Sequence, residues 1–150
     1  MEANAQRKLI ALDADDLVVI AADVQDGVVR AGNIIWRQDE KRLVLGLVRV
    51  GWERSVAPGS RPHRLQSALR FDRVLACQSR NIDPELPDAV LDLLAIEFQP
   101  GDAPGGHVVL LFAGGGALRL DVECVECELA DLGPYDLGIG ACALAPEFGV

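Results

Sequence analysis

The residues with the clearest capacity for chemistry are arginines, gathered in the middle of an acidic chain. Residues 49–80 hold seven arginines and carry a local net charge of +5, although the whole chain carries −9. Four basic residues, Arg54, Arg61, His63 and Arg64, lie in or beside one stretch rich in proline and glycine. Guanidinium groups grip a phosphate or a carboxylate through parallel hydrogen bonds. The pattern predicts a site for an anionic ligand or an acidic partner protein.

The same arginines also allow a purely structural interpretation. Residues 81–150 hold thirteen acidic residues and a single basic one, so their net charge is −12. Arginines on one strand would then pair with carboxylates on neighbouring strands. Trp52 and Phe71 flank the arginine stretch in sequence, and aromatic rings there would suit a stacking ligand. The sequence leaves both interpretations open.

Two cysteines form a CxxC pattern, Cys124-Val125-Glu126-Cys127. A redox pair needs a helix N-terminus to lower the thiol pKa, and a zinc site needs a second pair of ligands. Here the pattern falls on an expected strand in an acidic run, and the other candidate ligands are isolated: Cys77, Cys142, His63 and His107. We therefore expect reduced thiols packed as small core residues, with no metal and no cofactor.

Catalytic patterns are weak. The triple glycine Gly114-Gly115-Gly116 lacks the following Lys-Ser/Thr of a phosphate-binding loop, and no nucleophile-elbow motif is present. The sequence thus favours a non-catalytic binding or protein-interaction module over an enzyme. The alternative is a small enzyme or ligand carrier with a pocket in a curved sheet, where His63 or His107 meets a carboxylate.

The element that opens the fold is a helix expected over residues 14–25. Asp13 suits the N-cap, because its carboxylate can accept from the free amides of the first turn. Gly27 lies where a C-terminal cap is expected. The apolar stripe at helical spacing consists of Leu17, Ile20, Ala21 and Val24.

After Gly27 the apolar period changes to two, which is typical of strands. The expected strands are 28–37, 42–53, 65–80, 89–99 (strand favoured over helix in its second half), 107–113 and 117–123. The last two form a hairpin around the three glycines, and the apolar parity shifts after Cys124, as a β-bulge would shift it. We predict an α+β fold, with one N-terminal helix packed on a curved or partly closed antiparallel meander sheet of about six strands.

Composition sets the class of protein. The chain of 150 residues suits a single domain over residues 1–134, followed by an irregular tail over 135–150. Its net charge argues against nucleic-acid binding and against anionic membranes. The apolar run near the start is interrupted by three aspartates, so we expect no signal peptide and a cytoplasmic protein. The partner is not identified, and a homodimer is one alternative.

Four blocks of sequence carry a resemblance to a known family. They are KLIALDADDL (8–17), RLVLGLVRVGWE (42–53), SALRFDRVLA (67–76) and FAGGGALRLDVECVECELADLGP (112–134). Together they resemble a family of small bacterial proteins, mostly alphaproteobacterial, catalogued as domain of unknown function number 2948. The resemblance implies a cytoplasmic single-domain protein and implies no catalytic or binding residue.

Overall fold

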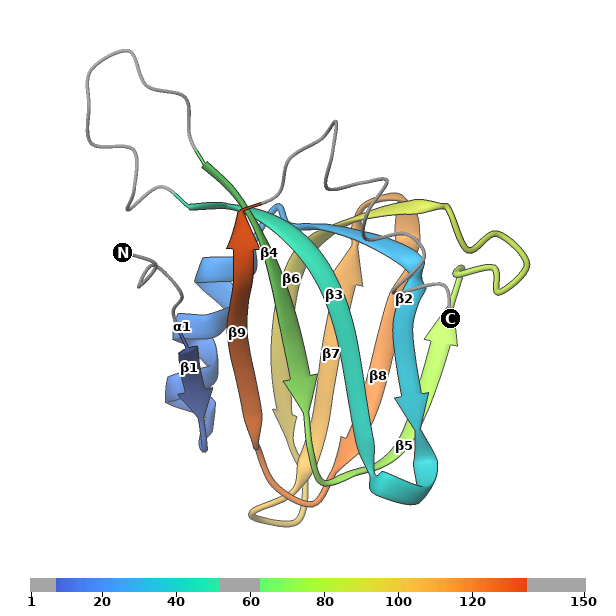
Figure 1. Ribbon diagram of the computed structural model, residues 1–150. Helices are drawn as coiled ribbons and strands as arrows, with labels where there is room; N and C mark the ends of the chain where they lie inside the picture. The colour runs from blue at the N-terminus through green and yellow to red at the C-terminus, as the bar shows by residue number, and fades with distance from the viewer. Residues whose placement is uncertain (1–7, 52–62, 135–150) are drawn as a thin grey trace.

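The structure is a computed structural model that describes residues 8–51 and 63–134, drawn in Figure 1. Within these residues it contains one α-helix and nine strands. In chain order the elements are β1 (Lys8–Ala11), α1 (Ala14–Val24), β2 (Val28–Arg37), β3 (Arg42–Gly51), β4 (His63–Phe71), β5 (Val74–Arg80), β6 (Val90–Pro100), β7 (Gly106–Phe112), β8 (Ala117–Val122) and β9 (Cys127–Pro134). Two short 3-10 turns, Gln38–Glu40 and Ala113–Gly115, join β2 to β3 and β7 to β8.

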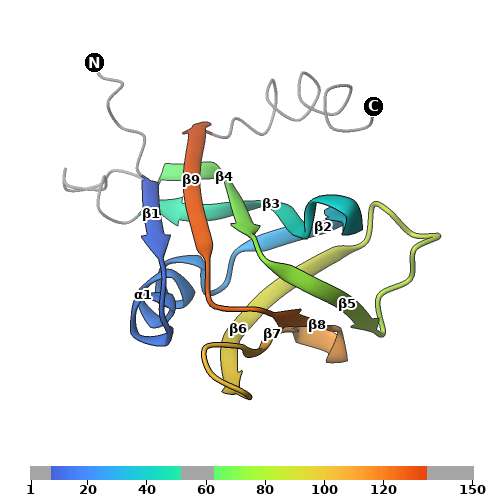
Figure 2. The same cartoon turned by 90° about the horizontal axis from the view of Figure 1, so that it is seen from below.

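The nine strands form one sheet in the order β1-β9-β4-β3-β2-β6-β7-β8-β5. Every neighbouring pair is antiparallel. Figures 1 and 2 show the sheet folding back on itself, so that β9, β4, β3 and β2 face β6, β7 and β8 across the core. The predicted α+β class with one helix and a large antiparallel sheet is confirmed. The predicted count of six strands was wrong, and the sheet is not closed, because β1 and β5 remain as its two edges.

The three additional strands have identifiable origins. β1 is a four-residue strand ahead of the helix that the sequence pattern did not reveal. The expected strand over 65–80 is divided into β4 and β5 at Asp72-Arg73, where Arg73 takes a positive φ of 62°. The expected bulge after Cys124 is instead a link between two strands, β8 and β9.

Both divisions occur at one corner of the sheet. The Asp72 amide donates to the Glu126 carbonyl and the Glu123 amide donates to the Arg73 carbonyl, each at 2.9 Å. The two bends therefore run side by side and stay hydrogen-bonded while both chains pass from one half of the sheet to the other. This bend turns β5 towards β8 and leaves β4 between β3 and β9.

The helix begins as predicted and ends differently. The Asp13 side chain accepts from the Asp16 amide at 2.8 Å, which confirms the N-cap. Leu17, Ile20 and Val24 are buried, and the predicted stripe member Ala21 is half-buried.

The C-terminal cap at Gly27 was wrong. Asp26 takes the left-handed conformation with φ of 67°, and Gly27 has a different role. It is buried, and a Cβ at this position would lie 2.6 Å from Leu47 Cδ1 and 2.9 Å from the Val24 carbonyl oxygen. Glycine is needed here because the chain leaving α1 passes directly over β3.

The core between the two halves is almost entirely aliphatic. Its fully buried large side chains include Leu43 and Leu45 of β3, Leu69 and Phe71 of β4, and Leu110 of β7. β3 lies between β2 and β4, so it is a central strand. Because each sheet strand contributes alternate residues to this core, the intervening residues form an outer face.

Two boundaries complete the description. The ambiguous stretch 89–99 is strand throughout, as β6. β9 continues to Pro134, and residues 135–150, where the irregular tail is expected, lie outside the described part of the chain. No helix among the described residues is long and apolar enough to cross a membrane.

Candidate functional site

The predicted arginine site falls mainly outside the described residues. Arg54 and Arg61 lie between β3 and β4, in the range 52–62, and for His63 only the strand position is described. That position pairs with Gly51, so the undescribed residues connect two antiparallel neighbours. Arg64 is exposed and makes no ion pair with any residue that the structure describes.

A buried polar cluster lies two strand positions inside this connection. Arg49 of β3 binds Asp131 of β9 through Nη2, at 2.9 Å to Oδ2 and 3.0 Å to Oδ1. Ser67 of β4 lies between the two strands, and its hydroxyl donates to Asp131 Oδ1 at 2.7 Å. Arg49 is 3% exposed, Asp131 is 5% exposed and Ser67 is 0% exposed. A paired and hydrogen-bonded charge is the form in which an arginine tolerates burial.

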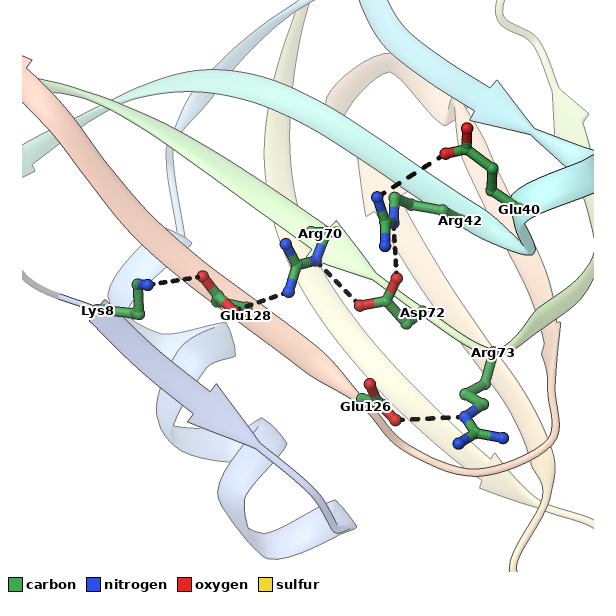
Figure 3. Close-up of polar contacts among 8 residues, drawn as sticks. All are labelled: Lys8, Glu40, Arg42, Arg70, Asp72, Arg73, Glu126 and Glu128. Carbon is green, nitrogen blue, oxygen red and sulfur yellow. Dashed lines mark hydrogen bonds and ion pairs between the residues drawn. The ribbon is translucent and has the colours of Figure 1, made fainter.

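A second group of charges lies on the outer face of the same strands, shown in Figure 3. Arg70 is at its centre, 2.8 Å from Glu128 and 2.9 Å from Asp72. Asp72 also accepts from Arg42 at 2.8 Å, and this hydrogen bond raises the pKa of the Arg42 guanidinium. Lys8, on the edge strand β1, adds a further ion pair to this group, because its Nζ lies 3.6 Å from Oε2 of Glu128 on β9.

A third group lies at the corner where β4 passes into β5. Arg73 lies 3.5 Å from Glu126 and 3.6 Å from Glu123. Lys41 donates to Glu123 at 3.1 Å, and Lys41 together with Arg73 lowers the pKa of the Glu123 carboxyl.

These three groups account for much of the arginine segment. Arg49, Arg70 and Arg73 each pair with a carboxylate from the acidic residues 81–150. The structural interpretation therefore holds for these three arginines. Arg64 and Arg80 are the described members of the segment that make no ion pair with a described residue.

The CxxC cysteines lie at the corner link. Cys127 is buried in the core cluster and Cys124 is half-buried. Burial raises the pKa of the Cys127 thiol and also that of Cys77, so both remain protonated at neutral pH. Among the described residues no three His, Cys, Asp or Glu side chains are grouped as metal ligands. Cys142 lies outside the described range.

His107 does meet a carboxylate, on the outer face of the sheet and not in the interior. Its Nε2 lies 2.6 Å from Asp121 Oδ1 and 3.0 Å from Arg119 Nη2. His107 on β7 and Asp121 on β8 are register partners, and the pair is partly exposed. His63 belongs to β4, which is not a neighbour of β7, so the two histidines occupy different parts of the sheet.

Beside this pair lies a groove that the sequence did not suggest. It has a volume of about 320 Å³ and opens on the outer face of β5, β8, β7 and β6. Its lining residues are Gln78, Ser79, Arg80, Gln99, Val109, Leu111, Ala117 and Arg119. The sequence signal was the alternation of Arg119 with buried leucines on β8, which places this arginine on the outer face. That alternation does not predict that β5, which supplies Arg80, lies beside β8.

Comparison with known proteins gives one match. The sequence profile of the family described as "Protein of unknown function (DUF2948)" matches residues 7–141. No curated protein matches. No solved structure matches.

Proposed function

The chain belongs to the DUF2948 family of unknown function, and we propose that it is a non-catalytic binding module. Its site is the arginine-rich connection between β3 and β4, taken together with the first two residues of β4, and its binding residues are Arg54, Arg61, His63 and Arg64. Its ligand carries a compact negative charge, either as a small anion or as an acidic segment of a partner protein.

The observation that supports this proposal is that several arginines are paired with carboxylates whereas Arg64 is not. Arg49, Arg70 and Arg73 are each paired with a carboxylate from residues 81–150. Arg64, by contrast, is exposed and makes no ion pair with any described residue. An unpaired guanidinium retains all its donors for an external carboxylate or phosphate. Arg54 and Arg61 are its neighbours in the same connection.

A charge-matched comparison tests the proposal. The triple variant R54Q/R61Q/R64Q removes three positive charges from the proposed site, and R30Q/R37Q/K8Q removes three from exposed positions on β1 and β2. Binding of a fluorescent poly-glutamate peptide and of pyrophosphate is measured by anisotropy and by calorimetry. The two probes separate an acidic partner from a small anion.

We expect the connection variant to lose at least tenfold in affinity for one of the probes, and the control to stay within twofold of the unaltered protein. The expected loss shrinks at high salt, because exposed charges are screened. An equal loss in both variants would mean that only overall charge matters, and no binding of either probe would remove the basis of the proposal.

A further inference from the structure

The outer groove is formed by side chains brought together by strand register. Arg119 of β8 lies opposite Val109 of β7 on one side and opposite Gln78 of β5 on the other. Arg80 lies opposite Ala117, two positions along from these partners. Arg80 and Arg119 are therefore diagonal neighbours on one face, a relation in which residues lie roughly 7–8 Å apart and their Cβ atoms somewhat closer.

The groove has a distinct chemical division. Val109, Leu111 and Ala117 supply apolar surface from the two central strands, β7 and β8. Polar side chains from the flanking strands surround them, namely Gln78, Ser79 and Arg80 of β5 and Gln99 of β6. Apolar surface with a few convergent polar groups is the usual composition of a small-molecule site, and about 320 Å³ is at the small end of the range.

Among the described residues, no carboxylate forms an ion pair with either arginine of the groove. No carboxylate is among its lining side chains, although the chain has 23 acidic residues. Arg80 makes no ion pair with a described residue, and the polar contact of Arg119 is with the imidazole of His107. The nearest acidic residues by register are Asp121, which contacts His107, and Glu97, which lies opposite Val109.

This arrangement differs from that of four other arginines among the described residues. Arg42, Arg49, Arg70 and Arg73 each have a carboxylate within 4 Å. Two neighbouring guanidinium groups without a carboxylate partner repel each other. An oxyanion bound between them would offset that repulsion.

We propose that the groove binds a small organic anion, with an oxyanion group held by Arg80 and Arg119 and a short apolar body lying on Val109 and Leu111. The oxyanion is a carboxylate or a phosphate monoester, since both match the guanidinium fork. The site is separate from the β3–β4 connection and does not depend on the function proposed for it.

The test uses four probes and the full chain. Hexanoate and hexyl phosphate carry both features of the ligand, inorganic phosphate lacks the apolar body, and hexanol lacks the charge. Binding is followed by the shifts of the side-chain amide signals of Gln78 and Gln99 in NMR titrations. Comparing the first two probes distinguishes a carboxylate from a phosphate ligand.

The titrations are repeated on variants that are expected to weaken binding and on variants that are not. R80Q and R119Q should each weaken binding of the preferred probe at least fivefold, and the double variant should abolish it. E97Q removes the neighbouring negative charge, so it should leave binding unchanged or strengthen it. R30Q/R37Q is the charge-matched control for the double variant and should stay within twofold. Thermal melts confirm that each variant is folded.

The proposal is overturned if no probe shifts the Gln78 or Gln99 signals at millimolar concentration. It is also overturned if inorganic phosphate binds as tightly as hexyl phosphate and hexanoate, or if R30Q/R37Q loses as much as R80Q/R119Q. The R54Q/R61Q/R64Q variant should retain full binding of the groove probe. Its result therefore separates failure of the groove from failure of the connection site.

Discussion

At the scale of single residues, burial of Arg49 and Asp131 removes two opposite charges from water. Their attraction offsets the desolvation only because the geometry is close and Ser67 supplies a further hydrogen bond. The three residues come from β3, β9 and β4, so this contact joins strands that are remote in sequence. Pairing of the arginines with the acidic half was one of two interpretations that the sequence left open, and the local pattern could not say which carboxylate Arg49 would meet.

A double-mutant cycle measures this contact. D131L should lower the free energy of unfolding by about 3–5 kcal/mol, because it deprives a buried guanidinium of its carboxylate. S67A should cost about 1 kcal/mol, the value of one hydrogen bond. The double variant R49M/D131L should lose clearly less than the sum of R49M and D131L, since no charge then remains buried at that place. Urea denaturation gives all four values, and strictly additive losses would contradict an energetically coupled pair.

At the scale of elements, the helix and most strands follow from local rules. Asp13 caps α1, and alternation along β3 places Leu43, Leu45 and Leu47 in the core. The end of the helix is different, because Gly27 is selected by its contact with β3 and not by the conformation of a helix cap. A glycine that accommodates a remote side chain gives the same sequence signal as one that ends a helix.

Two glycines provide a matched test of this assignment. G27A adds a Cβ 2.6 Å from Leu47 Cδ1 and 2.9 Å from a backbone oxygen, so we expect a loss of about 1–3 kcal/mol in unfolding free energy. G46A adds a Cβ whose nearest neighbour, Asn33 Cβ, lies at an ordinary 3.8 Å. The latter change should be neutral or stabilising by a few tenths of a kcal/mol, because alanine restricts the unfolded chain. Chemical denaturation of both variants checks the difference, and equal stabilities would refute close packing at Gly27.

At the scale of the whole molecule, the fold is one open sheet wrapped around an aliphatic core, with α1 contributing Leu17, Ile20 and Val24 to that core. Cys127 and Cys77 are part of the same interior surface, so global unfolding exposes both thiols to water. Their protonation therefore links folding stability to pH.

We predict a loss of stability in alkaline solution. Burial holds the folded pKa of Cys127 and Cys77 above the ordinary value of 9.0, so the folded protein keeps both protons while the unfolded chain releases them. This stabilising contribution is complete below pH 9.0 and is lost as the pH rises above it. Cys127, the more deeply buried thiol, should contribute up to about 1.4 kcal/mol per pH unit, and Cys77 should contribute less.

Unfolding free energies measured at pH 8, 9 and 10 check this slope. C127A should be less stable than the unaltered protein at pH 8, because a buried sulfur is lost. Its stability should nevertheless fall less steeply between pH 9 and 10. Parallel slopes for the two proteins would rule out Cys127 as a source of the pH dependence.

Local features of the sequence were enough to predict one capped helix, the period-two strands after it and the glycine hairpin, and the charge asymmetry allowed arginines to pair with the acidic half. Local alternation records which face of a strand is buried, because successive side chains point to opposite faces. It carries no record of which strands become neighbours. Tertiary packing decided that β5 lies beside β8 and β9 beside β4, since the bends at Arg73 and at residues 123–126 depend on hydrogen bonds between those two bends. The same pairing brought Arg80 next to Arg119, and the outer groove exists only for that reason.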